Sequence, residues 1–390
     1  MRVGIYLGPS APTVGGVYSF TDSLLRGLER RGLGSHEVTV IYGGRRNPPV
    51  TTLPVVSYRL GSAAYVMRAG DLLHAAAGMR RSHPINKTLH ENGIDFLWIP
   101  QPDNLPILDV PYAFTPLDIA HREYPFFPEV SYAGFTWDQR EALYRSMLPR
   151  ATFVVAGNET GAAALNFHYA VPRERIVVIP LPAPEVHAGP RDQPLRGTRP
   201  YLLYPAQFWP HKNHITALHA LKVARERHGL DIDLVLTGSD KGNLDYVRRT
   251  AADLGLTNAV HFRGFVAKAE LDQLYLGATA LLYLSLFGPD NLPPLEAFAM
   301  GVPVIASAIP GHVDQLGDAA LLVDPLSPEA IAEGIDRLVN DSRLSSDLVA
   351  RGRMIAGERS VTEYLARVET IASNFEGMRR LWPLASKQPE

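Results

Sequence analysis

Short apolar runs alternate with longer segments of helical period along the first part of the chain. The predicted helix over Val17 to Arg31, for example, places Phe20, Leu24, Leu25 and Leu28 on one face. Strands are predicted at Val3 to Leu7, Glu37 to Tyr42, Phe96 to Ile99, Tyr112 to Phe114, Thr152 to Ala156 and Ile176 to Ile179. This alternation predicts a parallel sheet with helices on both faces.

The alternation stops at 183–200, a Pro- and Gly-rich segment without periodicity, and then restarts. The second set of strands is predicted at Tyr201 to Tyr204, Asp233 to Thr237, Val260 to Phe262, Ala280 to Leu284, Val304 to Ala306 and Ala320 to Val323. The pattern therefore predicts an α/β protein with two Rossmann-like domains, 1–190 and 195–360, which face each other across a cleft. We expect the last helix, within 361–390, to pack back on the first domain. Ligands of such sheets bind at the carboxyl ends of the strands.

Composition narrows the class of protein. The 390 residues carry a net charge of −2, so the chain as a whole gives no electrostatic case for binding nucleic acid. The absence of cysteine excludes disulfides, thiol chemistry and cysteine metal sites. MRVGIYLGPSAP is predicted to be a strand and a turn rather than a signal peptide, and no run is long enough to cross a bilayer. We therefore expect a cytoplasmic protein.

One helical segment, Ala63 to Asn92, has a basic amphipathic face with Arg68, Arg80, Arg81 and Lys87. The ordinary interpretation is a solvated helix face. Contact with an anionic membrane surface, at the inner face of the membrane, is the alternative.

Four loops share one layout, in which a strand ends, a loop follows and a helix begins. They contain Gly15 and Gly16, the segment 205–213 (PAQFWPHKN), the segment Gly264-Phe265-Val266, and the stretch 284–311. This layout points backbone N–H groups and the positive end of a helix dipole toward an anion. Gly15 and Gly16 are either a tight turn or a loop whose missing side chains let a ligand approach the backbone.

The stretch 284–311 (LSLFGPDNLPPLEAFAMGVPVIASAIPG) is the most informative of the four. We expect a short helix that opens near Leu295 and Glu296 and stops at Gly301. Glu296, in its first turn, is placed to accept hydrogen bonds from ligand hydroxyl groups. The alternative is a plain connection in which Glu296 complements the helix dipole.

Lys212 and Gln207 lie in the segment 205–213. A lysine at a helix start is unfavourable beside the dipole unless an anion binds there, although a surface lysine is the simpler alternative. Gln207 can donate a hydrogen bond to the same anion. In the first half, Asp118 and His121 are candidate polar groups of the cleft, with a helix N-cap and a surface histidine as the alternatives. Metal-site, P-loop and G-x-S-x-G hydrolase motifs are absent from the sequence.

Several of these pieces together resemble the retaining glycosyltransferases of family 4 (glycosyl transferases group 1, GT-B fold). The resemblance rests on GGVYSF, ERIVVIPLP, YPAQFWPHKNH, VHFRGFV, LDQLYLGATALLYLS and NLPPLEAFAMGVPVIAS, which occur in the family's order. The subgroup with FGP-x-N-x-PPLEA, many of them mannosyl- or rhamnosyltransferases of bacterial surface polysaccharides, is the most similar. The resemblance implies a hexosyltransferase that moves sugar from a nucleotide-diphosphate sugar to a glycan or lipid-linked acceptor, without a metal or other cofactor.

The resemblance also implies roles for individual residues. Lys212 would bind the donor diphosphate, Glu296 the ribose, and the backbone of Phe265 and Val266, after Gly264, the nucleobase. Asn291 and Leu292 would offer N–H groups to sugar and phosphate, and Gly16 would approach the diphosphate from the first domain. The predicted catalytic group is His121, Asp118 and Lys212. The remaining predicted donor-binding residues are Gly15, Gln207 and Asp290.

Three positions depart from the family pattern. Gly288 stands where the first Glu of the E-x7-E motif is expected, with Asp290 nearby but out of register. Gln207 replaces the Arg that accompanies the Lys, and Leu117 replaces the His of the H-D pair, so that His121 is the expected substitute. The alternative from another class is a catalytically silent protein that binds sugar nucleotides or acts as a scaffold, and Gly288 and Leu117 are the best arguments for it.

Overall fold

The computed structural model describes residues 1–9, 16–44, 48–58, 83–103, 105–184 and 199–382. Its first sheet has seven strands, all parallel, in the order β3-β2-β1-β4-β5-β6-β7. The strands are β1 (Arg2–Leu7), β2 (Glu37–Tyr42), β3 (Val55–Ser57), β4 (Phe96–Ile99), β5 (Tyr112–Phe114), β6 (Phe153–Ala156) and β7 (Ile176–Val178). Their buried Val, Ile, Phe and Tyr side chains are typical of a sheet covered on both faces.

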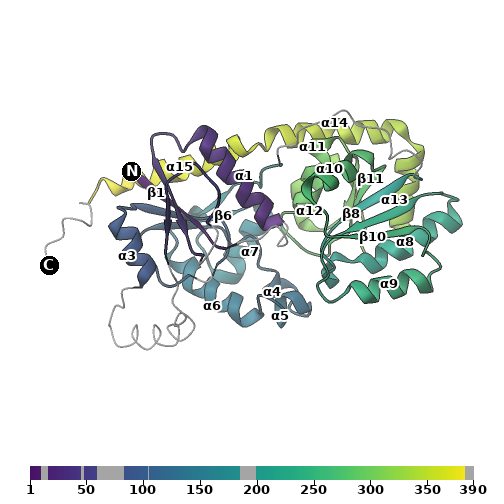
Figure 1. The fold of residues 1–390 in the computed structure, drawn as a ribbon, viewed down its shortest axis with the longest axis horizontal. Helices are drawn as coiled ribbons and strands as arrows, with labels where there is room; N and C mark the ends of the chain where they lie inside the picture. The colour runs from purple at the N-terminus through teal and green to yellow at the C-terminus, as the bar shows by residue number, and fades with distance from the viewer. Residues whose placement is uncertain (10–15, 45–47, 59–82, 104, 185–198, 383–390) are drawn as a thin grey trace.

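Helices cover this sheet on both faces (Figure 1). They are α1 (Gly16–Arg31), α3 (Pro84–Glu91), α4 (Ala120–Glu123), α5 (Pro128–Ser131), α6 (Trp137–Met147) and α7 (Glu159–Tyr169), with 3₁₀ turns at Leu148–Arg150 and Arg173–Arg175. Leu24 and Leu28 of α1 pack on one face, and Leu143 and Met147 of α6 belong to the core on the other. The short helices α4 and α5 lie on the side of the first half that faces the second half.

The second sheet has six parallel strands in the order β10-β9-β8-β11-β12-β13. These strands are β8 (Tyr201–Pro205), β9 (Asp233–Thr237), β10 (Val260–Gly264), β11 (Ala280–Tyr283), β12 (Val304–Ser307) and β13 (Leu321–Val323). The covering helices are α8 (His214–Arg227), α9 (Leu244–Asp253), α10 (Lys268–Gly277), α11 (Leu292–Met300), α12 (Pro310–Leu316), α13 (Pro328–Asn340) and α14 (Ser342–Glu358), with 3₁₀ turns η4 (Pro210–Lys212) and η5 (Gly317–Ala319). In each sheet the strand order reverses at the first strand, β1 or β8, which is where ligands bind in such folds.

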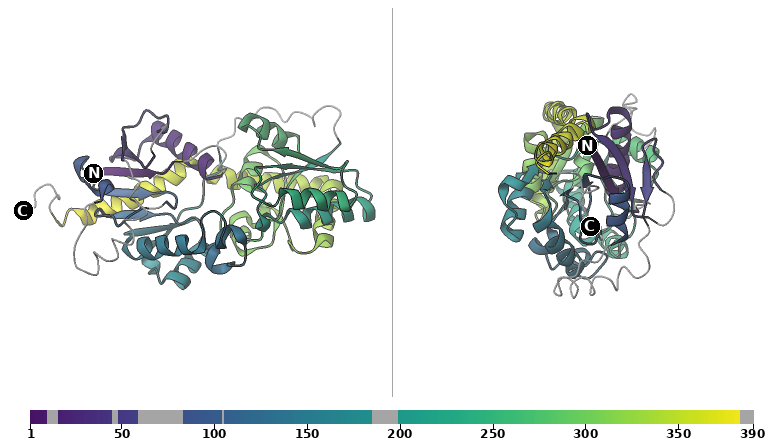
Figure 2. Two further views of the ribbon diagram at one scale, coloured as in Figure 1. Left: turned by 60° about the horizontal axis from the view of Figure 1, so that its bottom comes forward. Right: turned by 90° about the vertical axis from the view of Figure 1, so that its left-hand side faces the viewer.

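The last helix, α15 (Val361–Arg379), leaves the second half and runs back along the first (Figures 1 and 2). Val361 and Leu365 contact α1 at Gly27, where a Cβ atom would come within 3 Å of both side chains. The buried face of α15 also includes Phe375, whose ring stacks on Phe96 of β4 at 4.8 Å. The first half is therefore completed by a helix from the far end of the chain.

The predicted fold class, two Rossmann-like α/β halves, is confirmed. Most predicted strands agree within a residue or two, but β3 lies where no strand was predicted. The three short helices α4 to α6 also follow β5 without having been predicted. Of the predicted helix Ala63 to Asn92 the structure describes only 83–92, with α3 beginning at Pro84. Its proposed membrane-facing arginines lie outside the described residues, and so does most of the Pro- and Gly-rich segment 183–200.

Candidate functional site

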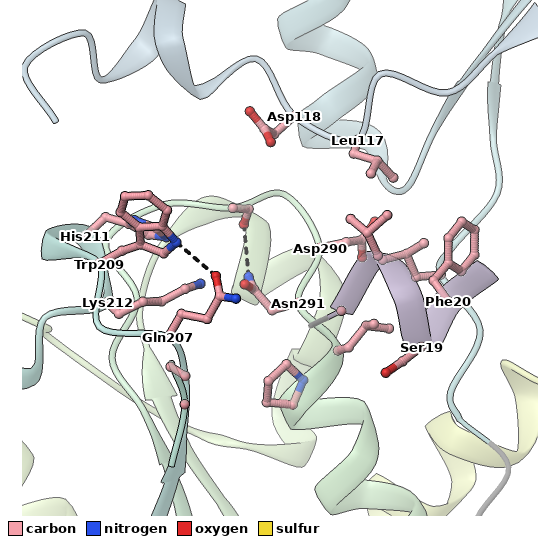
Figure 3. A pocket seen from close by; sticks show the side chains of 18 of the residues that line it. Ser19, Phe20, Leu117, Asp118, Gln207, Trp209, His211, Lys212, Asp290 and Asn291 are labelled. Atoms are coloured by element: carbon pink, nitrogen blue, oxygen red, sulfur yellow. Dashed lines mark hydrogen bonds between the residues drawn. The ribbon is translucent and has the colours of Figure 1, made fainter. Parts of the chain in front are cut away.

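A cavity of about 590 Å³ lies between the two halves. Its walls come from the carboxyl ends of the strands and the loops that follow them, in both sheets. All four loops singled out in the sequence contribute described residues to this cavity. The first of these loops contributes Gly16. Gly15 lies outside the described residues. In Figure 3, Gln207, Trp209, His211 and Lys212 lie on one side of the cavity, and Leu117 and Asp118 on the other.

Lys212 ends the 3₁₀ turn η4 and precedes α8 by two residues, so it lies just before the helix rather than in it. Asn213, with a left-handed φ of +55°, makes the sharp turn between the two. The ammonium Nζ donates to the hydroxyl groups of Tyr283 at 2.8 Å and Ser285 at 3.3 Å. Within the described part of the chain, no carboxylate forms an ion pair with Lys212. A half-buried cation with only neutral partners is suited to bind an anion.

Gln207 and Trp209 continue the same wall. The indole Nε1 of Trp209 donates to Oε1 of Gln207 at 3.0 Å, which fixes the amide orientation and directs its NH₂ group away from the indole (Figure 3). Gly238 packs so closely beside this segment that a Cβ atom there would lie 2.2 Å from the carbonyl oxygen of Ala206. Backbone atoms of Ala206 and Gly238 therefore pack directly against each other in this wall of the cavity.

The loop before α11 is shaped by two residues. Gly288 has a φ of +130°, and a Cβ there would lie 2.9 Å from Nδ2 of Asn291. The side chain of Asn291 is held by the hydroxyl of Tyr283 at 3.0 Å and by Nε2 of His312 at 3.0 Å. The unusual φ is a physical reason for glycine at the position where the family pattern has glutamate.

Helix α11 begins at Leu292, three residues earlier than expected, because prolines fit the first turn of a helix. Glu296 is therefore the fifth helical residue and not part of the first turn, which corrects the prediction. It still lines the cavity, is buried, and accepts a hydrogen bond from the hydroxyl of Tyr275 at 2.7 Å. Burial raises the pKa of Glu296, against the opposing effect of that hydrogen bond.

Gly264 is the last residue of the edge strand β10, and Phe265 and Val266 follow it. Gly264 has a left-handed φ of +64° at a register irregularity against β9, and it does not line the cavity itself. Phe265 and Val266 do line it. Phe265 is 52% exposed, so its ring is free to cover a flat ligand group.

The first half contributes Gly16 and Asp118. Gly16 opens α1 and lies so near α11 that a Cβ would be 3.3 Å from Cδ1 of Leu292. Oδ1 of Asp118 accepts from Nη1 of Arg140 at 3.0 Å and from the N–H of Ala120 at 3.0 Å, so this side chain both lines the cavity and stabilises the start of α4. The preceding Leu117 has a φ of +63°, a conformation that costs a non-glycine residue about 1–3 kcal/mol and that collects at functional sites.

The structure does not bring His121 to the cavity. Its imidazole is fully buried, with Nε2 at 3.1 Å from Oε1 of Glu141 and 2.9 Å from the hydroxyl of Tyr169. Glu141 is also paired with Arg122 and Arg145. Burial lowers the pKa of His121, and its hydrogen bond to the Glu141 carboxylate opposes this. His121 therefore lies neither in the cavity, as a catalytic residue would, nor on the surface, which was the alternative. Helix α4 turns its side chain into the core beside α6 and α7.

Asp290 lines the cavity at the contact between the halves. A Cβ on Gly157 of the first half would collide with its carboxylate, and Oδ1 is buried with no hydrogen-bond partner among the described residues. Burial raises the pKa of Asp290 to about 6, with Arg359 opposing the rise and Asp314 adding to it.

Three residues that line the cavity were not predicted from the sequence: Trp209, Tyr283 and Glu129. Glu129 belongs to α5 of the first half, yet it is buried against His211 of the second. Burial tends to raise its pKa, but hydrogen bonds from His211 hold the pKa of Glu129 below its usual range. Burial, together with the nearby charge of Lys212, lowers the pKa of His211 to about 4. Both shifts favour an ionised carboxylate and a neutral imidazole near neutral pH. Only one feature of the sequence could have indicated Glu129: it is an acidic residue within an aromatic segment, YPFFPEVSY.

Part of the chain is similar in sequence to known glycosyltransferases. Residues 188–354 match the family model for glycosyl transferases group 1. The O-antigen chain mannosyltransferase B of Escherichia coli is 30% identical over 153 residues, which are 39% of this chain and 40% of that protein. The MMP alpha-(1->4)-mannosyltransferase of Mycolicibacterium hassiacum is 29% identical over 204 residues, 52% of this chain and 48% of that protein. The chain thus spans less than half the length of these relatives.

Solved structures match over nearly the whole chain. HepE of Anabaena, in complex with UDP and glucose, has a TM-score of 0.70 at 16% identity and covers 96% of this chain and 100% of its own. Sucrose-phosphate synthase of Thermosynechococcus elongatus has a TM-score of 0.72 at 16% identity, covering 98% and 100%. These similarities establish the GT-B fold.

Among the described residues, no helix has the length and apolar character needed to span a membrane.

Proposed function

We propose that this protein is a retaining glycosyltransferase that moves a hexose or deoxyhexose, of the mannose or rhamnose type, from a nucleotide-diphosphate sugar to a glycan or lipid-linked acceptor. The main support is the meeting of Lys212, Glu296 and the start of α11 in one cavity between the halves. A diphosphate needs a cation and N–H donors, and a ribose needs a hydroxyl acceptor. The mannosyltransferase relatives favour mannose as the sugar.

In the proposed reaction, the bond between the anomeric carbon and the diphosphate oxygen breaks. The acceptor oxygen forms the new bond to that carbon, and the acceptor proton leaves with the nucleoside diphosphate. Lys212 would stabilise the negative charge that develops on the leaving diphosphate, with N–H groups at Asn291 and Leu292 beside it. We propose that these groups, rather than a metal ion, bind the diphosphate. Contact between the halves would keep water from the donor and so limit hydrolysis.

We also propose that Gln207 hydrogen-bonds to the diphosphate and that Phe265 and Val266 hold the nucleobase. Asp290 and Asn291 would face the sugar. Asp118, held by Arg140, is the remaining candidate for contact with the reacting groups, whereas His121 is buried in the core of the first half. Synthesis of a surface polysaccharide is the proposed biological setting.

The test is turnover with a panel of GDP-, UDP- and dTDP-sugars, measured as nucleoside diphosphate released in the presence of candidate glycan and lipid-linked acceptors. We expect release to depend on acceptor and to continue in EDTA. Loss of activity in EDTA would contradict the metal-free diphosphate site. Tight nucleotide binding without release under any acceptor would instead identify a silent sugar-nucleotide binding protein.

A further inference from the structure

Glu129 crosses from one half of the molecule to the other. It lies on α5, but its Oε1 accepts a hydrogen bond from the backbone N–H of His211 at 3.0 Å and another from the Nδ1–H of the same residue. Both residues are buried, at 7% exposure each. A buried carboxylate is costly unless donors satisfy it. The pairing therefore ties α5 to the 3₁₀ turn η4.

His211 in turn joins the two loops that carry most of the donor-side residues. Its carbonyl oxygen accepts from the N–H of Leu286 at 2.9 Å. Its ring stacks on Phe287 with centroids 4.0 Å apart and an interplanar angle of 16°. One loop continues directly into Lys212, and the other continues into Gly288 and Asn291. A shift of His211 would therefore move both walls of the diphosphate site.

The first half covers this joint with aromatic rings. Tyr124 stacks on Phe287 at 5.3 Å, and Phe127 approaches both Phe287 at 5.6 Å and His211 at 6.2 Å. These contacts exclude water, so the hydrogen bonds between Glu129 and His211 lie in a medium where they are stronger than in water. These rings and hydrogen bonds together hold His211 and Phe287 against the first half.

We propose that Glu129 is a positioning residue for the donor site: by binding the N–H and imidazole of His211, it fixes the backbone from which Lys212 and the loop at Phe287 approach the diphosphate. The proposal rests on the proposed function, and it extends that function by making a residue of the acceptor-side half part of donor binding. Displacements of about an ångström are enough to weaken binding and catalysis at such sites.

The first experiment measures the affinity for GDP, UDP and dTDP by calorimetry in Glu129→Ala and Glu129→Gln. Glu129→Ala removes the acceptor of both hydrogen bonds, and we expect a roughly tenfold higher Kd, equal to about 1.4 kcal/mol. Glu129→Gln retains an oxygen for the same N–H groups, and we expect it to recover most of the affinity. Glu129→Gln as weak as Glu129→Ala would overturn the proposal, because the charge or the second carboxylate oxygen would then be the essential feature.

His211→Phe completes a double-mutant cycle, since it keeps the stacked ring and loses the Nδ1 donor. The double variant should bind no more weakly than Glu129→Ala alone, because both changes break one contact. Thr160→Val is the matched control: it removes another hydrogen bond between the halves, from Oγ1 of Thr160 to Asp314 at 2.6 Å, and leaves the hydrogen bonds between Glu129 and His211 in place. An equal loss of affinity in Thr160→Val would contradict the proposal, because any contact between the halves, and not the positioning of His211 by Glu129, would then account for the affinity.

Hydrogen exchange without nucleotide provides a readout that does not depend on the proposed function. We expect Glu129→Ala, but not Thr160→Val, to speed exchange at residues 211–213 and 286–291. Unchanged exchange there would overturn the positioning role. A wild-type protein that binds none of the three nucleotides, yet shows the expected exchange, would contradict the proposed function and leave the positioning of these loops established.

Discussion

At the scale of single residues, the partners of the Lys212 ammonium group among the described residues are neutral: the hydroxyl groups of Tyr283 and Ser285 and the ring of Tyr283. A charge-assisted bond to a diphosphate is worth about 1.5–3 kcal/mol, or roughly a 10- to 150-fold change in Kd. Lys212→Met should therefore raise the Kd for the nucleoside diphosphate by that factor, measured by calorimetry. Lys222→Met, on the outer face of α8, is the control and should bind as the wild type does. Equal affinity of Lys212→Met and wild type would remove Lys212 from the site.

Asp290 makes a second prediction at this scale. Because burial raises its pKa from 3.8 to about 6, the folded protein holds this proton more tightly than the unfolded chain. Stability from this group is therefore present below about pH 4 and is lost as the pH rises to about 6. The loss amounts to at most about 3 kcal/mol.

Asp290→Asn removes the titration, so its free energy of unfolding relative to wild type should increase between pH 4 and pH 7.5. Urea unfolding at both pH values measures this difference. The acid sensitivity of other groups cancels in the comparison, because both proteins contain them. A difference that does not change with pH would mean that Asp290 titrates normally.

At the scale of elements, α15 belongs to the core of the first half although it follows the second half in the chain. Leu365 is fully buried in that core, and burying it accounts for part of the stability of the first half. Leu365→Ala should lower the free energy of unfolding by about 2–5 kcal/mol. Arg367→Ala, exposed on the same helix, should change it by less than about 0.5 kcal/mol. Equal effects of the two variants in urea unfolding would show that α15 is detached in solution.

At the scale of the whole molecule, the two halves touch at several places around the cavity. Besides the Glu129–His211 joint, Oγ1 and the N–H of Thr160 donate to Asp314 at the contact of α7 with α12. Nδ2 of Asn158 also donates to the carbonyl oxygen of Pro289. Donor entry and product release would then require the halves to separate, as domain closure does in other enzymes.

The absence of cysteine makes this separation testable. Thr160→Cys combined with Asp314→Cys places two thiols at that contact, and a short bifunctional cross-linker should join them without denaturation. The cross-linked protein should release nucleoside diphosphate more slowly than the same protein before cross-linking, measured by stopped-flow displacement. Each single cysteine variant, treated alike, is the control. An unchanged release rate would show that release needs no opening at this contact.

The sequence by itself determined the two parallel sheets, because runs of buried β-branched and aromatic residues alternate with helical periods. It also predicted that the strand-end loops lie together around a cleft, since parallel strands bring their carboxyl ends to one edge, and these loops do line the cavity. Lys212 and Asn291 could be assigned to the cavity this way because they lie in strand-end loops, and Glu296 because it lies in the helix that follows one of those loops.

Tertiary structure alone decided which side chains of the short helices face the cavity. His121 follows Asp118 by three positions, and only the packing of α4 on α6 and α7 sends Asp118 to the cavity and His121 into the core. Glu129 and His211 are 82 residues apart, so no local pattern could pair them. The return of α15 to the first half was expected from the sequence, but its contact with α1 at Gly27 depends on shape complementarity. Periodicity encodes which face of an element is buried, whereas contacts between distant elements depend on how those faces fit in space.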